Sequence, residues 1–159
     1  MTNEQLIIDE LLQEKRMLLG EKEKNEKRIK ELEVIIERYK EICKYSSYKI
    51  AINTHNIENF RKNKDFHFSH PMTLEHLSFF ILNKMSYEER HMRKLQRESK
   101  FLSMKRRSAQ ERMQPYQDEK KYLEFENIDI KNRIVIIDYE LEKNQINQTP
   151  KIKVLKKEA

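Results

Sequence analysis

The sequence predicts an all-α, elongated protein, and three observations lead to this fold class. Apolar residues recur at spacings of three and four along most of the chain, which is the period of one helix face. The 159 residues include one glycine, Gly20, whereas tight β-hairpins favour glycine at positive φ. Charged residues make up 38% of the chain and hydrophobic residues 37%, which suits long helices with a narrow buried stripe.

Residues 1–45 are predicted to form a coiled-coil helix that brings copies of the chain together. Its a and d heptad positions form a coiled-coil pattern that contains Lys15 and a polar gap from Lys22 to Lys27. Because a seam of this length needs a partner of similar length, we expect a homo-oligomer through this helix. The alternative is an amphipathic helix that packs on the rest of its own chain. The predicted oligomer seam comprises Leu11, Leu18, Ile29, Leu32, Ile36 and Tyr39.

Residues 46–72 are predicted to be an irregular connector, because this stretch combines asparagines, charged residues and Pro71. Tyr48, Ile50 and Ile52 alternate as in a short strand, although the same residues also fit an extension of the preceding helix. Thr73 then precedes a short apolar helix over 74–84. This short helix is the first part of a helical region that is predicted over 73–148.

Residues 86–113 are predicted to be a basic amphipathic helix. Residues 90–112 contain 9 Lys or Arg against 2 Asp or Glu, whereas the chain as a whole carries +6. Ser86 and Glu89 have the spacing of a capping box at its start, and Pro115 is expected to end it. A helical wheel places His91, Leu95, Ser99, Leu102, Ala109 and Met113 on one stripe, and all the cations except Arg106 away from it.

Beyond Pro115 the three-four spacing resumes, which predicts another helix that lies antiparallel to the basic one. Its repeated positions are Leu123, Asn127, Ile130, Ile134, Ile137 and Leu141. The predicted fold is therefore an N-terminal coiled-coil helix, a short helix and a C-terminal antiparallel helical hairpin. Residues 149–159 are expected to form a flexible tail.

The composition argues against several kinds of chemistry. Phosphate-binding loops and nucleophile elbows need glycines that this chain does not have. His67 and His70 are one close pair of possible metal ligands, with His76, His55 and Cys43 further away, whereas structural zinc sites use two close pairs. We therefore expect no metal, no cofactor and no enzymatic activity. No run approaches the roughly 18 apolar residues of a membrane span, and we expect an intracellular protein of cytoplasm or nucleus.

The basic helix is the candidate binding surface, and its cations match a phosphate backbone. An exposed aromatic residue among them is suited to stacking on a base. We expect a non-catalytic accessory protein that binds nucleic acid or docks into a nucleoprotein complex. The alternative is a protein-binding adaptor or inhibitor that acts through its coiled-coil and helical-hairpin surfaces and does not bind nucleic acid, with an acidic protein surface as the partner of the basic face. A helix-turn-helix with its turn at 84–86 is a further variant. The candidate nucleic-acid-binding residues are Arg90, Arg93, Lys94, Arg97, Lys100, Phe101, Lys105, Arg107 and Arg112.

Overall fold

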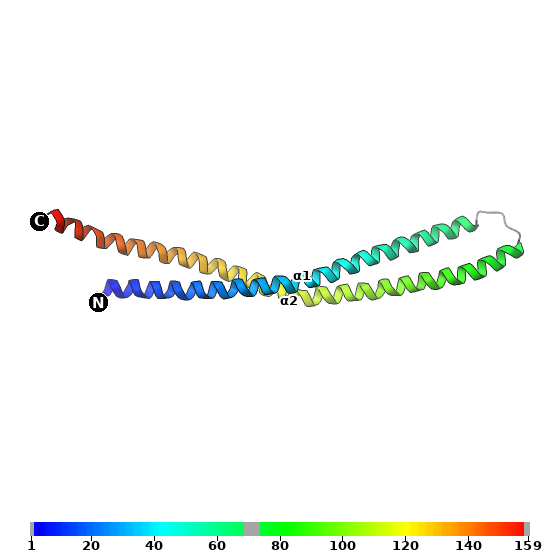
Figure 1. Cartoon of the computed structure of the whole chain (residues 1–159), viewed down its shortest axis with the longest axis horizontal. Coiled ribbons are helices and arrows are strands. Elements are labelled where there is room, and N and C mark those ends of the chain that lie inside the picture. The colour runs from blue at the N-terminus through cyan, green and yellow to red at the C-terminus, as the bar shows by residue number, and fades with distance from the viewer. Residues whose placement is uncertain (1, 69–73, 158–159) are drawn as a thin grey trace. The chain divides into compact units, whose positions relative to one another are not determined.

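The computed structural model contains two long helices, α1 (Asn3–Phe68) and α2 (Leu74–Lys157), shown in Figure 1. It describes residues 2–68 and 74–157, and the side chains of residues 2–62 and 87–145. The predicted all-α class is confirmed, and the two helices pack against each other. α1 runs through Gly20 without a break.

The chain forms two compact units, each made of one stretch of α1 and one stretch of α2. Unit 1 combines Met1–Val34 with Tyr116–Ala159, and unit 2 is the continuous segment Ile35–Pro115. Each unit is described separately below.

In unit 1 the helices pack in antiparallel fashion around aliphatic side chains. Leu11 of α1 packs with Ile137 and Leu141 of α2, and Ile8 and Leu18 lie against this cluster. Leu32 and Ile137 are fully buried. The predicted positions Leu123, Asn127, Ile130, Ile134, Ile137 and Leu141 are all buried or partly buried, which is the expected result of their three-four spacing.

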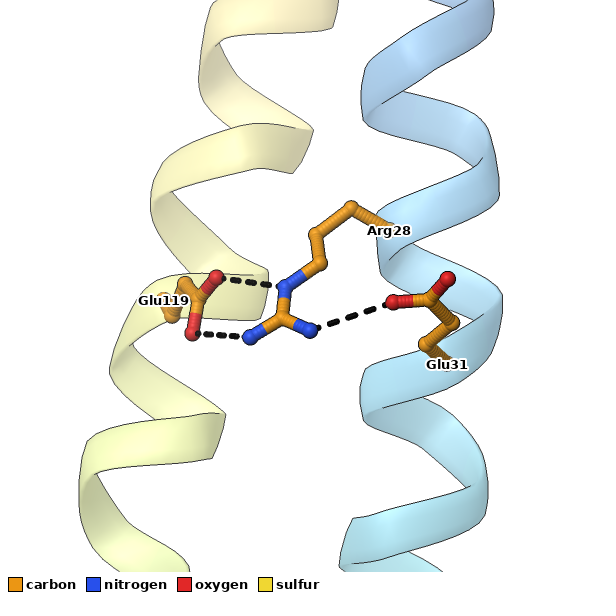
Figure 2. Close-up of polar contacts among 3 residues, drawn as sticks. All are labelled: Arg28, Glu31 and Glu119. Carbon is orange, nitrogen blue, oxygen red and sulfur yellow. Dashed lines mark hydrogen bonds and ion pairs between the residues drawn. The ribbon is translucent and has the colours of Figure 1, made fainter.

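Ion pairs along the flanks of unit 1 also join the two helices. Arg28 donates from Nε to Oε1 of Glu119 at 2.8 Å and from a terminal nitrogen to Oε2 at 3.3 Å (Figure 2). The other pairs that join the helices here are Arg133–Glu14 at 2.7 Å, Lys120–Glu33 at 3.0 Å and Lys15–Asp138. The partners of Glu14 and Lys15 lie further along α2 than those of Arg28 and Glu33, so the two helices run in opposite directions.

A polar layer lies within this seam. The amide nitrogen of Asn25 donates to Oδ1 of Asn127 at 3.0 Å and to Oε2 of Glu126 at 2.9 Å. A polar residue at a seam position favours the one register in which its hydrogen bonds form. Asn25 and Asn127 therefore set the alignment of α1 on α2 in unit 1.

Unit 2 also consists of two antiparallel helical stretches, and its interior is more polar. Among those residues of unit 2 whose side chains are described, Ile36, Leu102 and Ala109 are the buried apolar ones, and Ser46 and Asn53 are buried as well. Arg106 lies partly buried in the seam, and its guanidinium donates to the hydroxyl of Ser47 at 3.2 Å. The thiol of Cys43 donates to the backbone carbonyl oxygen of Arg106 at 3.8 Å.

The secondary structure corrects the prediction between residues 46 and 72. Residues 46–68 belong to α1, so the part of the predicted connector that the structure describes is helical. The three-four spacing of buried and partly buried positions continues there through Ser46, Ile50, Asn53, Ile57 and Phe60. Ser46 and Asn53 are residue types typical of loops, but here they lie on the buried stripe of α1.

The predicted break at Pro115 is also wrong, because α2 runs through this residue. Proline cannot donate the bond to the carbonyl of Glu111, and its ring clashes with the preceding turn, at a cost of about 3 kcal/mol in a helix interior. The repeat of buried positions nevertheless passes from Ala109 and Met113 to Tyr116 and Lys120 without a shift. The predicted C-terminal hairpin of two helices is therefore not formed, and Pro115 marks the end of unit 2 instead.

The bounds of α2 also correct three smaller expectations. α2 begins at Leu74, where the short helix is predicted to begin, but it continues through residues 84–86, so neither a separate short helix nor a helix-turn-helix turn is present there. It also extends to Lys157, so the predicted tail is helical up to that residue. The functional division into 1–45, 46–72, 73–148 and 149–159 stays a prediction.

The predicted oligomer seam is buried or partly buried at each of its residues. In unit 1, however, the partner of this stripe is α2 of the same chain, since Leu11 packs with Ile137 and Leu141. This packing is the alternative that the sequence leaves open, namely an amphipathic helix on its own chain. Pairing between copies through these residues stays a prediction.

Candidate nucleic-acid interface

The two units differ in charge. Unit 2 contains 17 Lys or Arg against 9 Asp or Glu, a net charge of +8. Unit 1 contains 16 against 18, a net charge of −2, and the two values account for the +6 of the chain. The excess of positive charge is thus confined to one compact unit, where the α2 segment 90–112 supplies most of it.

All nine predicted nucleic-acid-binding residues are exposed, and we call them together the basic surface. The side chain of Phe101 is 65% exposed, although it is a large aromatic residue. Met104 is exposed to the same extent. Leu95, Ser99, Leu102, Ala109 and Met113 form the buried and partly buried stripe, as predicted. The prediction is wrong for His91, which is exposed.

The cations of the basic surface are not neutralised in the way those of unit 1 are. Arg107 pairs with Glu111 one turn further along α2, at 3.1 Å. Within the part of the chain whose side chains are described, six further cations of this surface form no ion pair, namely Arg93, Lys94, Arg97, Lys100, Lys105 and Arg112. In unit 1, by contrast, four described ion pairs bridge α1 and α2. The basic surface therefore keeps charge available for an anionic partner.

The cations of the basic surface occupy one broad arc of α2, on the side away from the buried stripe. On a wheel centred on the buried stripe, Arg97 lies directly opposite α1, with Arg93 to one side and Lys94 to the other. Lys105 and Arg112 lie close to the boundary with α1. The groove described next places Lys105 and Arg112 beside α1, which a wheel of α2 alone does not show.

A shallow groove of about 440 Å³ lies between α1 and α2 where the basic surface meets α1. Phe101, Met104 and Ala109 contribute apolar side chains from α2, and Lys105 and Arg112 add positive charge. The remaining lining residues are Tyr39 and Ile42 from α1 and Ser108 from α2. Sequence reasoning missed Ile42 and Ser108 as surface partners of Phe101, because the groove depends on the register between the two helices.

The histidines and the cysteine show no metal-binding arrangement in the part of the chain that is described. His55 shares a hydrogen bond of 3.1 Å with Asn59 one turn along α1, and Cys43 is partly buried against the backbone of α2. The side chains of His67, His70 and His76 lie outside the described residues. The described helices also include none that is long and apolar enough to cross a membrane.

Comparisons with known proteins do not assign the chain to a family. No protein-family model, no curated protein and no solved structure shows significant similarity to the chain. A function can therefore be inferred only from the distribution of charge and exposed apolar groups over the two units.

Proposed function

We propose that the protein is a non-catalytic accessory protein that holds nucleic acid on the basic surface of unit 2. The observation that carries this proposal is the set of six exposed cations on α2 that form no ion pair with a described residue. At a rise of about 1.5 Å per residue, the segment from Arg90 to Arg112 extends for about 35 Å, enough to follow several phosphates of a nucleic-acid strand.

The chemistry of the surface suits binding without sequence preference. Cations that replace condensed counterions along a phosphate backbone provide affinity that does not depend on the bases. Phe101 adds an exposed aromatic ring next to Lys105 and Arg97, and base stacking on such a ring contributes about 1–3 kcal/mol in single-stranded complexes. We therefore expect single strands to bind more tightly than duplex of the same length.

The test is the salt dependence of binding to a single-stranded oligonucleotide and to a DNA duplex. Replacing Arg93, Lys94, Arg97 and Lys105 with Gln prevents the neutralisation of up to four phosphates and hardly changes helix propensity. For duplex DNA the slope of log K against log salt should become shallower by up to about 3.6, which corresponds to about 0.9 for each phosphate that is no longer neutralised. Phe101→Ala should weaken binding of the single strand more than binding of the duplex.

A matched control removes the same charge from unit 1. Arg16, Lys24, Lys30 and Lys131 are exposed and form no ion pair with a described residue, so their replacement with Gln lowers the net charge equally. This control should keep most of the slope. Equal reductions of the slope in the two variants, or no salt-dependent binding at about 50 mM salt, would contradict the proposal.

The groove favours a second candidate function, that of an adaptor which binds an acidic amphipathic helix. Apolar groups from Ile42, Phe101 and Met104 lie beside Lys105 and Arg112, an arrangement that fits an apolar helix stripe with acidic flanks. Replacing Ile42 and Met104 with Gln removes apolar groups from the groove and keeps every cation. Under the nucleic-acid proposal this variant binds oligonucleotides as before, whereas under the adaptor reading it no longer binds the protein partner.

A further inference from the structure

The face of α2 that points away from α1 in unit 1 is unusually apolar. Tyr122, Phe125 and Tyr139 are 66%, 58% and 67% exposed, although they are large aromatic residues. Ile128, Val135 and Ile136 are also exposed, while their neighbours Ile130 and Ile137 pack on α1. An apolar patch of this kind on a helix that is already packed on one side indicates a further protein contact.

The spacing on this face is that of a second helix-packing stripe. Residues follow one another at alternating steps of four and three, which is the seam pattern of two paired helices. We call this stripe the outer face of α2, and it comprises Asp118, Tyr122, Phe125, Asp129, Asn132, Ile136, Tyr139 and Lys143. It extends for about 39 Å at 1.5 Å per residue.

We propose that the outer face of α2 pairs in antiparallel fashion with the same face of a second copy of this chain. The stripe reads similarly in both directions, with an apolar pair of residues on each side of a polar centre. In the pairing centred between Ile130 and Lys131, Tyr122 meets Tyr139 of the second copy, and Phe125 meets its Ile136. Two-fold symmetry repeats both contacts, so the four apolar positions are all covered.

The polar positions of the stripe are complementary in the same register. Asp129 lies opposite Asn132 of the second copy, whose amide is a hydrogen-bond donor for the carboxylate. Asp118 lies opposite Lys143 at each end. These contacts fix the register in the way that Asn25 and Asn127 do within the chain.

The flanking positions agree with this alignment. On one side of the stripe Ile128 meets Val135 of the second copy, and Lys121 meets its Glu142. The ammonium of Lys121 lies 6.0 Å from the centroid of the Phe125 ring, at the edge of the apolar face, where it can reach a carboxylate on an adjoining helix. On this side of the stripe, charge and apolarity are thus matched.

The same residues argue against the other arrangements. A parallel pair of outer faces would place Asp118 and Asp129 each against its own counterpart in the second copy, and like charges in direct opposition are destabilising. Pairing through the predicted oligomer seam would compete with α2, which already covers Leu11 in unit 1. Antiparallel pairing through the outer face leaves the packing of the chain unchanged and avoids these like-charge contacts.

Sedimentation equilibrium of the full chain tests this interface. The unmutated protein should form a dimer below about 100 µM, and replacing Phe125 and Ile136 with Glu should raise the dimer dissociation constant at least about a hundredfold, because charge would be buried in an apolar contact. Both residues are exposed within the chain, so the helical circular dichroism signal should stay the same. Replacing Ile7 and Val34 with Glu is the matched control on α1, where both side chains are exposed, and it should leave the dimer intact.

A charge exchange and a cross-link test the direction of pairing. Lys121→Glu should weaken the dimer and adding Glu142→Lys should restore it. In a Cys43→Ser background, a mixture of Asp129→Cys and Asn132→Cys chains should form a mixed disulfide in preference to either homodimer. A monomeric unmutated protein, a dimer that survives the Phe125 and Ile136 changes, or preferential homodimer disulfides would overturn the proposal. None of these outcomes bears on the basic surface, because the outer face contains no residue of unit 2.

Discussion

Arg28 of α1 donates to both carboxylate oxygens of Glu119 of α2, and it also contacts Glu31 one turn along its own helix at 3.1 Å (Figure 2). The hydrogen bonds from Arg28 lower the pKa of Glu119 below its ordinary value of 4.5, and those from Arg133 lower the pKa of Glu14 in the same way. Both bridges join α1 to α2 within unit 1, so protonation of these carboxyl groups is linked to the stability of that unit.

The sign of this linkage predicts a loss of stability in acid. Each carboxyl group has a lower pKa in the folded chain than in the unfolded chain, so its contribution is complete above the ordinary value of 4.5 and is lost as the pH falls through the folded pKa. The melting temperature should therefore fall below about pH 4.5. Replacing Glu14 and Glu119 with Gln should lower the melting temperature modestly at pH 7 and make its decline in acid shallower.

Replacement of Glu10 and Glu21 with Gln is the control for this prediction, because these carboxylates are exposed and form no ion pair with a described residue. The control should keep the steeper decline of the unmutated protein. Identical acid profiles for the two double variants, followed by circular dichroism, would show that the bridges do not contribute to the pH dependence.

The helical periodicity is sufficient to predict the fold class and the buried stripes. Leu32, Ile36, Leu102 and Ile137 are buried, and the three-four spacing places each of them on a stripe. The period of a stripe is a local property of the chain, which explains why it can be read from the sequence. The errors arise where local signals and packing disagree.

Asn53 and Pro115 show how packing outweighs such local signals. Asn53 is typical of a loop, yet it is 3% exposed on the stripe of α1, because the apolar residues around it keep the helix packed. Pro115 is typical of a helix end, but its unfavourable effect is local, whereas the contacts of the neighbouring turns extend along the helix. Propensity scales contain no term for a second helix.

The sequence does not predict which helix packs on a buried stripe, nor the groove in unit 2, and the reason here is different. Leu11 has the same spacing whether it packs on a second chain or on Ile137, so the sequence leaves both alternatives open. The groove requires that Ile42 lie beside Lys105, which depends on the register between helices that are far apart in sequence. The candidate cations are correctly predicted as exposed, because a charge-rich helix face needs no partner to be recognised.

The second prediction compares two residues of α1 that lie on opposite faces. Leu32 is fully buried and Val34 is 55% exposed, two positions further along. Leu32→Ala should lower the free energy of unfolding by about 2–5 kcal/mol, because it leaves a cavity between α1 and α2. Val34→Ala should change it by no more than about 0.5 kcal/mol. Chemical denaturation measures both, and similar effects would contradict the packing described for unit 1.

Substitutions in this stripe report on folding as well as on assembly. Replacing both Leu32 and Ile36 with Asp would dissociate an oligomer if these residues formed the seam between copies of the chain. Both side chains, however, are buried within the chain itself. Such a variant would bury charge between α1 and α2 and unfold them. Only surface changes such as those on the outer face of α2 test association without this effect.

The third prediction uses neighbouring serines in unit 2. The hydroxyl of Ser46 is buried without a hydrogen-bond partner among the described residues, whereas Ser47 is exposed and accepts a hydrogen bond from Arg106. Both changes to Ala raise helix propensity by a similar amount, so their difference reflects the surroundings. Ser46→Ala should additionally remove the cost of burying an unbonded hydroxyl, which is about 1–3 kcal/mol, without creating a cavity.

Ser46→Ala should therefore stabilise the protein more than Ser47→Ala, which removes the acceptor of the Arg106 hydrogen bond. Thermal unfolding followed by circular dichroism at matched protein concentration distinguishes the two variants. The reverse order would mean that the Ser46 hydroxyl has a partner in solution, such as a bound water, and that the polar interior of unit 2 is satisfied. The expected order would instead show that the buried, unbonded hydroxyl of Ser46 lowers the stability of unit 2.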